Sequence, residues 1–474
     1  MKIPAFPVIS LLLAASLSAP GQESSADAAS NSREAPNVIY ILADDLGVGD
    51  VGCYGQEKLK TPRIDRLAEE GMRFTRHYSG SASCAPTRSS LMTGQHTGHT
   101  RIRKNDVGPL LPEDVTVAEV LKSAGYRTGA MGKWGVGEKN TTGVPWEQGF
   151  DYFFGYLNQA RAHHHYPDFL WANDSKRLYP DNPEVRTHYS HDEFTREALV
   201  FLEETRENPD EPFFLYLPYT LVHVDLDVPH DSMEPWIGEI EETEPYGTPG
   251  GQHYIHQERP HAAFAGMVSR LDRDVGRIVD AVDRLGLAED TLIIFSSDNG
   301  PTPAGGADPE FFDGNGPFRG IKFSLHEGGI RAPMIARWSG RIAPGTTTDH
   351  MSAHWDVLPT LAELAGVESP EGIDGISFLP TLLGRGEDQE KHDLLYWEVN
   401  AQDGWQAIRR GKWKAHRIGT TTPADTVVEL YDLEADIAES RNIAEDHPDV
   451  VDELIRDMNA SRTPPTTGHD FIIP

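Results

Sequence analysis

The sequence predicts an α/β protein with a large, mostly parallel mixed sheet sandwiched by helices, followed by a small C-terminal antiparallel sheet with one helix. Short apolar runs alternate with helical stretches along most of the chain, which is typical of a parallel sheet covered on both faces. Past Asp393 the pattern changes to short, closely spaced strand-like segments. Such spacing indicates an antiparallel meander.

Buried strands of the large sheet are expected where the apolar runs lie, at 38–42, 127–131, 213–217 and 291–295. Helices are expected at 61–68, 115–124, 191–205 and 262–285, with another directly after Cys84. Thr61 and Ser190 are the expected N-caps of two of these helices, and Gly125 and Gly286 are typical helix stops. The acidic, Pro- and Gly-rich stretch 229–260 predicts a long surface excursion.

The C-terminal subdomain is expected over 393–474, after a main domain over 36–392. Its predicted strands lie at 394–397, 406–409, 413–416 and 427–431, and its helix lies at 448–458.

The N-terminus predicts export. Lys2, the apolar run 8–15 and small residues up to Gly21 are typical of a signal peptide over 1–21, with a polar linker over 22–35. The apolar run is too short to span a bilayer, so we expect no membrane insertion and a periplasmic or secreted protein.

Charge restricts the partners. The chain has 42 basic and 74 acidic residues, a formal net charge of −32, which disfavours nucleic acid because the phosphate backbone would be repelled. An anionic substrate would need a local concentration of positive charge against this overall field.

Cys84 is one of only two cysteines, the other being Cys53. Pro86 fits the first turn of a helix, so Cys84 is expected at the helix N-terminus, with Arg88 one turn further on. This environment favours an anion at or near the side chain. A small buried cysteine beside a helix cap is the alternative interpretation.

Polar side chains follow two of the expected buried strands: Asp44 and Asp45 after the first, and Asp298 and Asn299 after a late one. In parallel sheets, ligands bind outside the carboxyl ends of strands. An all-oxygen donor set with three formal negative charges suits a hard cation such as Ca²⁺ or Mg²⁺. Taken singly, each pair is equally typical of turn or cap chemistry.

Three further residues stand after strands or between glycines: Lys133, His223 and Lys322. A lysine in a glycine-rich loop is often only solvated, and a histidine at a strand end is often packed neutral. Their spacing relative to the acidic pairs favours a shared site.

These segments resemble the formylglycine-dependent sulfatases. The resemblance rests on five spaced motifs in order: 44–45, Cys-Ala-Pro-Thr-Arg at 84–88, Gly-Lys-Trp at 132–134, Asp-Asn-Gly at 298–300, and Arg-Gly-Ile-Lys at 319–322 with the following Glu-Gly-Gly-Ile-Arg-Ala-Pro. It implies an alkaline-phosphatase-like fold and a nucleophile made from Cys84 by oxidation to an aldehyde, whose hydrate attacks sulfur.

The resemblance also implies the cofactor and the partners. Asp44, Asp45, Asp298, Asn299 and the modified Cys84 would hold one Ca²⁺ ion, while Arg88, Lys133, His223 and Lys322 would act on the sulfate ester. A formylglycine-generating enzyme would mature the chain. Secretion and aromatic-rich insertions favour a sulfated glycan as substrate, with a phosphate or phosphonate ester hydrolase, or an inactive carbohydrate-binding relative, as alternatives.

One departure concerns the base that releases sulfate. Many relatives have a histidine two residues after the Gly-Lys-Trp lysine, and this chain has Gly135. His99, His326 or a water are candidates for that base. Two further patches, 101–104 and His163 to His165, could hold a sugar or another anionic group.

Overall fold

A computed structural model describes residues 1–2, 35–105, 108–250, 254–399, 404–420 and 426–466. Residues 33–474 form one compact unit. The expected signal peptide and linker lie outside the described residues, apart from Met1, Lys2 and Ala35. The centre of the unit is a ten-stranded sheet with the order β11-β2-β10-β9-β1-β8-β4-β5-β6-β7, which confirms the expected fold class.

The middle of this sheet is parallel. β1 (Asn37–Ala43) lies between β8 (Phe213–Pro218) and β9 (Thr291–Ser297) and runs parallel to both, and β4 (Arg127–Lys133) and β5 (Tyr152–Tyr156) extend the parallel set. The edge strands are shorter and mixed in direction: β2 (Met72–Phe74), β6 (Phe169–Ala172), β7 (Ser175–Leu178), β10 (Met334–Arg337) and β11 (Thr346–Thr348).

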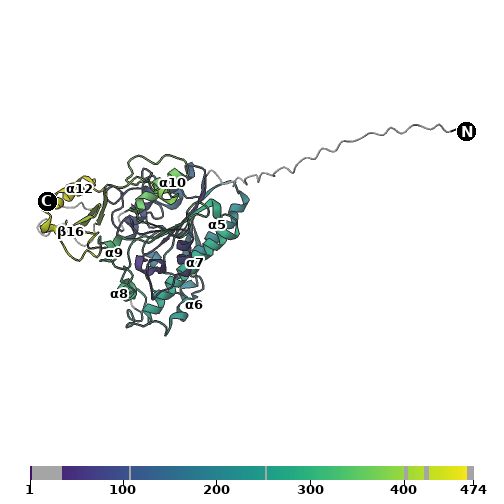
Figure 1. The fold of residues 1–474 in the computed structure, drawn as a ribbon. Coiled ribbons are helices and arrows are strands. Elements are labelled where there is room, and N and C mark those ends of the chain that lie inside the picture. The colour runs from purple at the N-terminus through teal and green to yellow at the C-terminus, as the bar shows by residue number, and fades with distance from the viewer. Residues whose placement is uncertain (3–34, 106–107, 251–253, 400–403, 421–425, 467–474) are drawn as a thin grey trace. The chain divides into compact units, whose positions relative to one another are not determined.

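Helices cover both faces of the sheet, as Figure 1 shows for α5 and α7 against α10. Alternate residues of β1 point into two cores: Ile39 and Ile41 pack with α1 (Pro62–Glu69), α5 (Ser190–Glu204) and α7 (Pro260–Arg284). Val38, Tyr40 and Leu42 pack on the other face with α2 (Cys84–Thr93), α3 (Val117–Ser123) and α10 (Val357–Leu364).

The remaining elements are short. They are the helices α4 (Asn182–Val185), α6 (His230–Met233), α8 (Pro309–Phe312), α9 (Glu327–Ile330) and α11 (Leu379–Leu382), and the two-stranded pair β3 (His77–Tyr78) and β12 (Ser352–Ala353). The excursion at 229–260 contains α6 and an isolated bridge between Tyr246 and Gln257.

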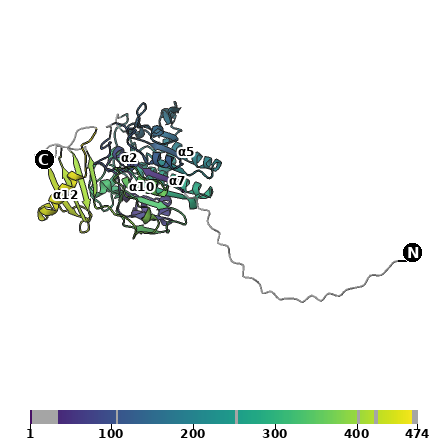
Figure 2. The ribbon, with the colours of Figure 1, turned by 90° about the horizontal axis from the view of Figure 1, so that it is seen from above.

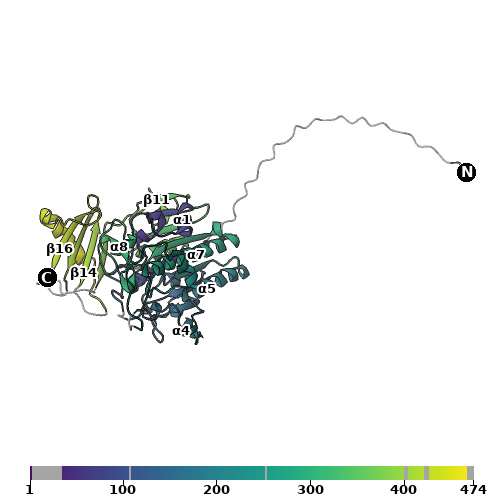
Figure 3. The ribbon, with the colours of Figure 1, turned by 90° about the horizontal axis from the view of Figure 1, so that it is seen from below.

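The C-terminal sheet is antiparallel, as expected, with the strands β13 (Leu395–Val399), β14 (Trp405–Arg410), β15 (Trp413–Ile418) and β16 (Val427–Asp432). The helix α12 (Pro448–Ala460) packs on it (Figures 2 and 3). Buried ion pairs join this sheet to α9, since Lys414 Nζ lies 2.8 Å from Glu327 Oε1 and 3.1 Å from Glu439 Oε1. The boundary at 392/393 stays a prediction.

Four helix starts differ from the expectation. α3 begins at Val117 instead of 115 and α7 at Pro260 instead of 262, and α2 and α5 differ as well. α2 includes Cys84 as its first residue, with Ser83 as N-cap, because Cys84 already has helical backbone geometry. α5 begins at Ser190, so Tyr189 and not Ser190 is its N-cap.

Candidate active site

The loops after β1 and β9 meet at the carboxyl edge of the sheet. The two strands pair in register from Asn37 with Thr291 to Ala43 with Ser297, so the residues that follow emerge side by side. The backbone N–H of Asp45 donates to Asp298 Oδ1 at 3.1 Å, and Asn299 Nδ2 donates to Asp45 Oδ1 at 2.7 Å. Parallel register therefore brings together acidic residues that are about 250 positions apart.

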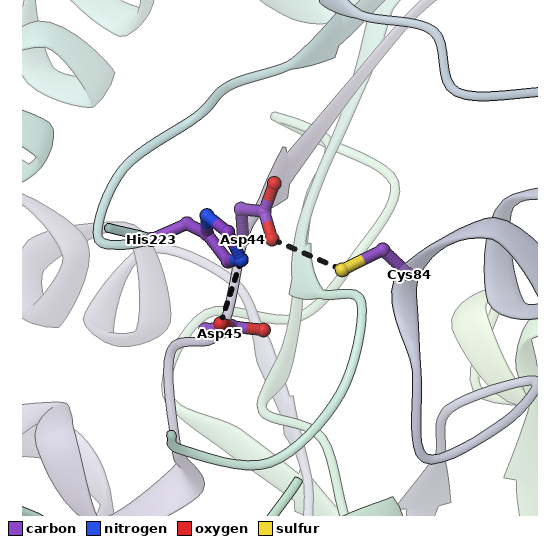
Figure 4. Close-up of side chains that lie close together, drawn as sticks. All are labelled: Asp44, Asp45, Cys84 and His223. Atoms are coloured by element: carbon purple, nitrogen blue, oxygen red, sulfur yellow. Dashed lines mark hydrogen bonds and ion pairs between the residues drawn. The ribbon is translucent and has the colours of Figure 1, made fainter. Parts of the chain in front are cut away.

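Cys84 reaches this edge from the N-terminus of α2. Its Sγ lies 3.5 Å from Asp44 Oδ1 and 3.4 Å from Lys322 Nζ, and Figure 4 shows the sulfur pointing toward Asp44. Burial raises the pKa of the Cys84 thiol, and the carboxylates of Asp298 and Asp44 raise it further, while Lys133 and Lys322 oppose the shift.

Arg88 lies one turn along α2 and joins the two acidic loops. Its Nη2 lies 2.8 Å from Asp298 Oδ2 and 3.3 Å from Asp44 Oδ2, while Nη1 donates to the carbonyl of Lys133 at 2.5 Å. The fork of the guanidinium thus fixes three separate loops relative to one another.

Two lysines complete the charged group. Lys133, the last residue of β4, has its Nζ 2.6 Å from Asp44 Oδ2, and Lys322 Nζ lies 2.7 Å from Asp45 Oδ1. All of these side chains are buried. Three carboxylates therefore face three cations in a largely buried site.

Burial and charge act in opposite directions on the carboxylates. Burial raises the pKa of Asp45 to about 6; Lys322 opposes this, while Asp44 and Asp298 add to it. For Asp44 burial also raises the pKa, but Lys133, His223, Arg88 and Lys322 outweigh it and hold the pKa well below its usual range. The crowding of carboxylates at Asp45 is the kind of repulsion that a divalent cation relieves.

The donor set fits a hard cation. Asn299 Oδ1 is buried and finds no hydrogen-bond donor within the described residues, which is costly unless a cation or water satisfies it. Ligand atoms of Asp44, Asp45, Cys84 and His223 lie within 4.8 Å of one another. Carboxylate and amide oxygens are typical Ca²⁺ and Mg²⁺ ligands.

His223 stands in the loop after β8, with Nε2 3.3 Å from Asp45 Oδ2 (Figure 4). Its backbone carbonyl accepts a hydrogen bond from His165 Nε2 at 3.2 Å, and its ring packs against His163 with centroids 4.8 Å apart. Burial, followed by the charge of Lys322, lowers the pKa of His223 well below its usual value, so its neutral form is favoured here. The histidines at 163 and 165 thus belong to this site.

Gly135 has a left-handed backbone, with φ +82°, which favours glycine. A Cβ at this position would lie 2.3 Å from Gln159 Nε2, and Gln159 Nε2 donates to the Gly135 carbonyl at 3.3 Å. The Gln159 amide therefore takes the space beside Arg88 that a side chain at 135 would enter. No sequence pattern points to Gln159, because it lies in an irregular loop.

The other candidate basic residues and histidines form their contacts away from Cys84. Arg101 pairs with Glu113 and Asp114, and Arg103 with Glu398 at 2.9 Å. His99 Nδ1 lies 2.8 Å from Asp374 Oδ1, and His326 packs against His416 and Trp405 in the C-terminal sheet. These contacts do not bring them to Cys84, and both cysteines are free.

Buried cations at the edge of a parallel sheet are able to stabilise negative charge on an anionic ester. Comparison with known families agrees. The sulfatase family matches residues 36–367, and the C-terminal part of N-sulphoglucosamine sulphohydrolase matches residues 321–463.

Individual proteins are similar over most of the chain. Human arylsulfatase A is 32% identical over 86% of this chain and 83% of its own length. An N-acetylgalactosamine-6-O-sulfatase of Bacteroides thetaiotaomicron is 32% identical over 97% of this chain and 98% of its own length. The crystal structure of Ps i-CgsB in complex with k-i-k-neocarrahexaose superposes with a TM-score of 0.77 and 27% identity, covering 92% of this chain and 95% of that one.

The chain belongs to the sulfatase family, and it is a sulfuric ester hydrolase. Among the described residues, no helix has the length and apolar character needed to cross a membrane.

Proposed function

We propose that this enzyme removes sulfate from a sulfated carbohydrate, using one Ca²⁺ ion and a formylglycine made from Cys84. The observation that carries the proposal is the position of Lys322, whose Nζ lies 2.7 Å from Asp45 and 3.4 Å from the sulfur of Cys84. One cation thus touches both the metal-binding group and the nucleophile position. Asp44, Asp45, Asp298, Asn299 and the side chain at 84 would hold the ion.

Charge balance supports a sulfate monoester. Asp44, Asp45 and Asp298 are matched by Arg88, Lys133 and Lys322, so the group is near neutral by itself. A bound divalent ion would give this group a net positive charge, within a chain whose formal net charge is −32. The ion would supply Lewis-acid stabilisation of charge on the sulfuryl oxygens.

The two lysines would bind the sulfuryl group. Lys133, at the end of β4, and Lys322, in the turn before α9, contact Asp44 and Asp45 respectively. With those carboxylates bound to a cation, both ammonium groups would turn their N–H donors to the ester. Fixed cations aimed at developing negative charge are usually the largest catalytic contribution.

The surroundings of Cys84 support the same chemistry. Burial and two carboxylates raise the pKa of the thiol, so the unmodified cysteine is a poor nucleophile at neutral pH. A formylglycine supplies a hydrated aldehyde, whose two hydroxyl groups allow attack on sulfur and subsequent release of sulfate.

His223 would act on the leaving alcohol. General acid catalysis would need the protonated ring, whereas burial and the charge of Lys322 favour the neutral ring. A neutral imidazole still carries one N–H, which can donate a hydrogen bond to the ester oxygen as it departs. In this role the neutral ring supplies a hydrogen bond, and the roughly 10²–10⁴ in rate that full proton transfer gives would need its protonation.

The test combines maturation with turnover. Trypsin would release the peptide His77–Arg88, which contains Cys84 and no other cysteine. Mass spectrometry of the exported protein should show this peptide as the aldehyde, and the same preparation should desulfate members of a panel of monosulfated sugars. N-acetylgalactosamine 6-sulfate belongs in the panel, because a relative that covers almost the whole chain carries that name.

Matched aryl sulfate and aryl phosphate esters distinguish the reaction class. Faster turnover of the phosphate would contradict the proposal and favour phosphoryl chemistry in the same site. An unconverted Cys84 together with sugar binding but no turnover would instead indicate an inactive carbohydrate-binding relative.

Maturation and location follow from the same proposal. A formylglycine-generating enzyme would act on the chain before it folds, since Cys84 is buried in the folded protein. The predicted signal peptide would direct the protein to the periplasm or the medium, where the enzyme would encounter sulfated glycans.

A further inference from the structure

The site opens on the side of His223 and Lys322. The exposed fraction is 0% for Lys133 and 1% for Cys84, but 5% for His223 and 8% for Lys322. A sulfate group bound between the lysines would therefore leave the rest of the substrate on the side of His223.

Two rings from separate segments lie on that side. His163, from the short turn Arg161–His163, packs against His223 with ring centroids 4.8 Å apart. Tyr254, from the far end of the 229–260 excursion, lies edge-on to His163 at 5.8 Å. Both rings are partly exposed, whereas His223 beneath them is buried.

We infer that His163, with Tyr254 beside it, forms the subsite for the sugar ring that carries the sulfate, and that His163 sets substrate specificity. The inference rests on the proposed function. His223 faces the ester oxygen in that proposal, so the carbon bonded to this oxygen must lie beyond His223, where the two rings are. Aromatic faces pack well against the C–H face of a sugar.

The protonation state of the His163 ring suits hydrogen bonding to a sugar hydroxyl. Its pKa is lowered to about 4, first by burial and then by the charge of Lys133. The ring is neutral at neutral pH and offers one donor and one acceptor nitrogen, which is what a hydroxyl group pairs with.

The experiment compares two substrates of the same enzyme: the monosulfated sugar that the desulfation panel finds fastest, and a small aryl sulfate that lacks a sugar ring. His163→Ala should lower kcat/KM for the sulfated sugar about tenfold or more, the value of one lost hydrogen bond to a substrate. The loss should appear mainly in KM. With the aryl sulfate, kcat/KM should change less than about threefold.

Two further variants distinguish the loss of hydrogen bonding by His163 from the loss of its ring packing and from nonspecific effects. His163→Phe keeps the ring against His223 but removes both nitrogens, so it should retain aryl sulfate activity and lose selectivity for the sugar. His164→Ala is the control, because that neighbour has a side chain 63% exposed and pairs with Asp225. It should leave both substrates unchanged.

A cavity of about 290 Å³, lined by Ala85, Gly135 and Gln159 among others, provides the competing location for the sugar. If Gln159→Ala changes sugar selectivity and His163→Ala does not, the sugar lies in that cavity and the inference is wrong.

Equal losses on both substrates in His163→Ala would also overturn the inference, since they would mean that His163 only orients His223. Binding of the sulfated sugar to a Cys84→Ala background, measured by calorimetry, gives a readout independent of Cys84 conversion. If the wild-type enzyme hydrolyses neither substrate, it is the proposed function that fails, and the two failures are thereby distinguished.

Discussion

The guanidinium of Arg88 lies 2.8 Å from the carboxylate of Asp298, and both side chains are buried. This pair joins α2, which carries Cys84, to the loop after β9. It therefore fixes the distance between the nucleophile position and the predicted metal ligands. A buried pair of this kind holds a geometry more than it adds net stability.

Removing Arg88 leaves buried carboxylates without their partner. Arg88→Ala is expected to destabilise the fold by about 3–5 kcal/mol and to abolish sulfate ester hydrolysis. Urea unfolding followed by tryptophan fluorescence measures the first effect, and aryl sulfate turnover the second. The control is Arg66→Ala, which breaks an exposed i,i+4 pair with Glu70 and should cost less than about 1 kcal/mol. Equal costs for the two variants would contradict the role given to Arg88.

Chelation of Ca²⁺ is expected to remove activity and lower the melting temperature. A ligand that binds only the folded state at 100 times its Kd stabilises by about 2.7 kcal/mol. Thermal unfolding with and without Ca²⁺ measures this shift. Asn299→Ala should reduce the shift, because it removes the buried Oδ1 that lacks a donor.

The matched control for the calcium experiment is Asp280→Asn. This carboxylate is 55% exposed and pairs with Arg63 on the surface, so its loss should leave the Ca²⁺-dependent shift unchanged. An identical shift in Asn299→Ala and wild type would show that Asn299 is not a ligand.

The left-handed backbone at Gly135 predicts a cost for any side chain there. Gly125 has a similar φ of +85°, but nothing lies within 4 Å of its would-be Cβ, so Gly125→Ala isolates the backbone cost of about 1–2 kcal/mol. Gly135→Ala should cost up to about 1.5 kcal/mol more, the value of the lost hydrogen bond from Gln159.

A Gln159→Ala background tests the source of that difference. In this background, Gly135→Ala should cost no more than Gly125→Ala, as measured by urea unfolding. If the extra cost persists without the Gln159 amide, another contact of Gly135 is responsible.

The pair of His392 and Asp356 predicts a pH-dependent contribution to stability. Burial by itself lowers the pKa of His392, but Asp356, whose Oδ1 lies 2.8 Å from Nε2, outweighs it and raises the pKa above the usual value. A histidine with a raised folded pKa stabilises fully below its unfolded pKa, near 6.5. The contribution is lost as the pH rises through the folded pKa.

The measurement compares wild type with His392→Asn in urea at about pH 5.5 and about pH 9. The difference in unfolding free energy should be larger at the lower pH. In an Asp356→Asn background the pH dependence of that difference should disappear, and its persistence there would assign it to another partner of His392.

The sequence predicted the structure best in segments of continuous apolar residues. The continuous apolar runs of β1, β8 and β9 predict buried parallel strands, and their ends correctly located the charged residues that meet at the sheet edge. The short edge strands, such as β10 and β11 with four and three residues, carry too little pattern to be predicted.

Contacts between loops that are far apart in the sequence could not be predicted from local sequence patterns. Arg103 belongs to a segment predicted to hold an anionic group, yet Glu398, almost 300 residues away, pairs with it in the folded chain. The contact of Gln159 with Gly135, and that of His163 with His223, likewise depend on how irregular segments close over the sheet. Composition alone does not determine such closure.

By itself, then, the sequence determined the fold class, the order of the elements and the residue types of the site, because these depend on local apolar periodicity and on motifs. Only the tertiary structure decided which charges neutralise one another, that Cys84 is buried beside Asp44 and Lys322, and which rings surround His223. Those properties depend on burial and on distances between segments far apart in the chain, since desolvation and charge pairing set both pKa values and accessibility.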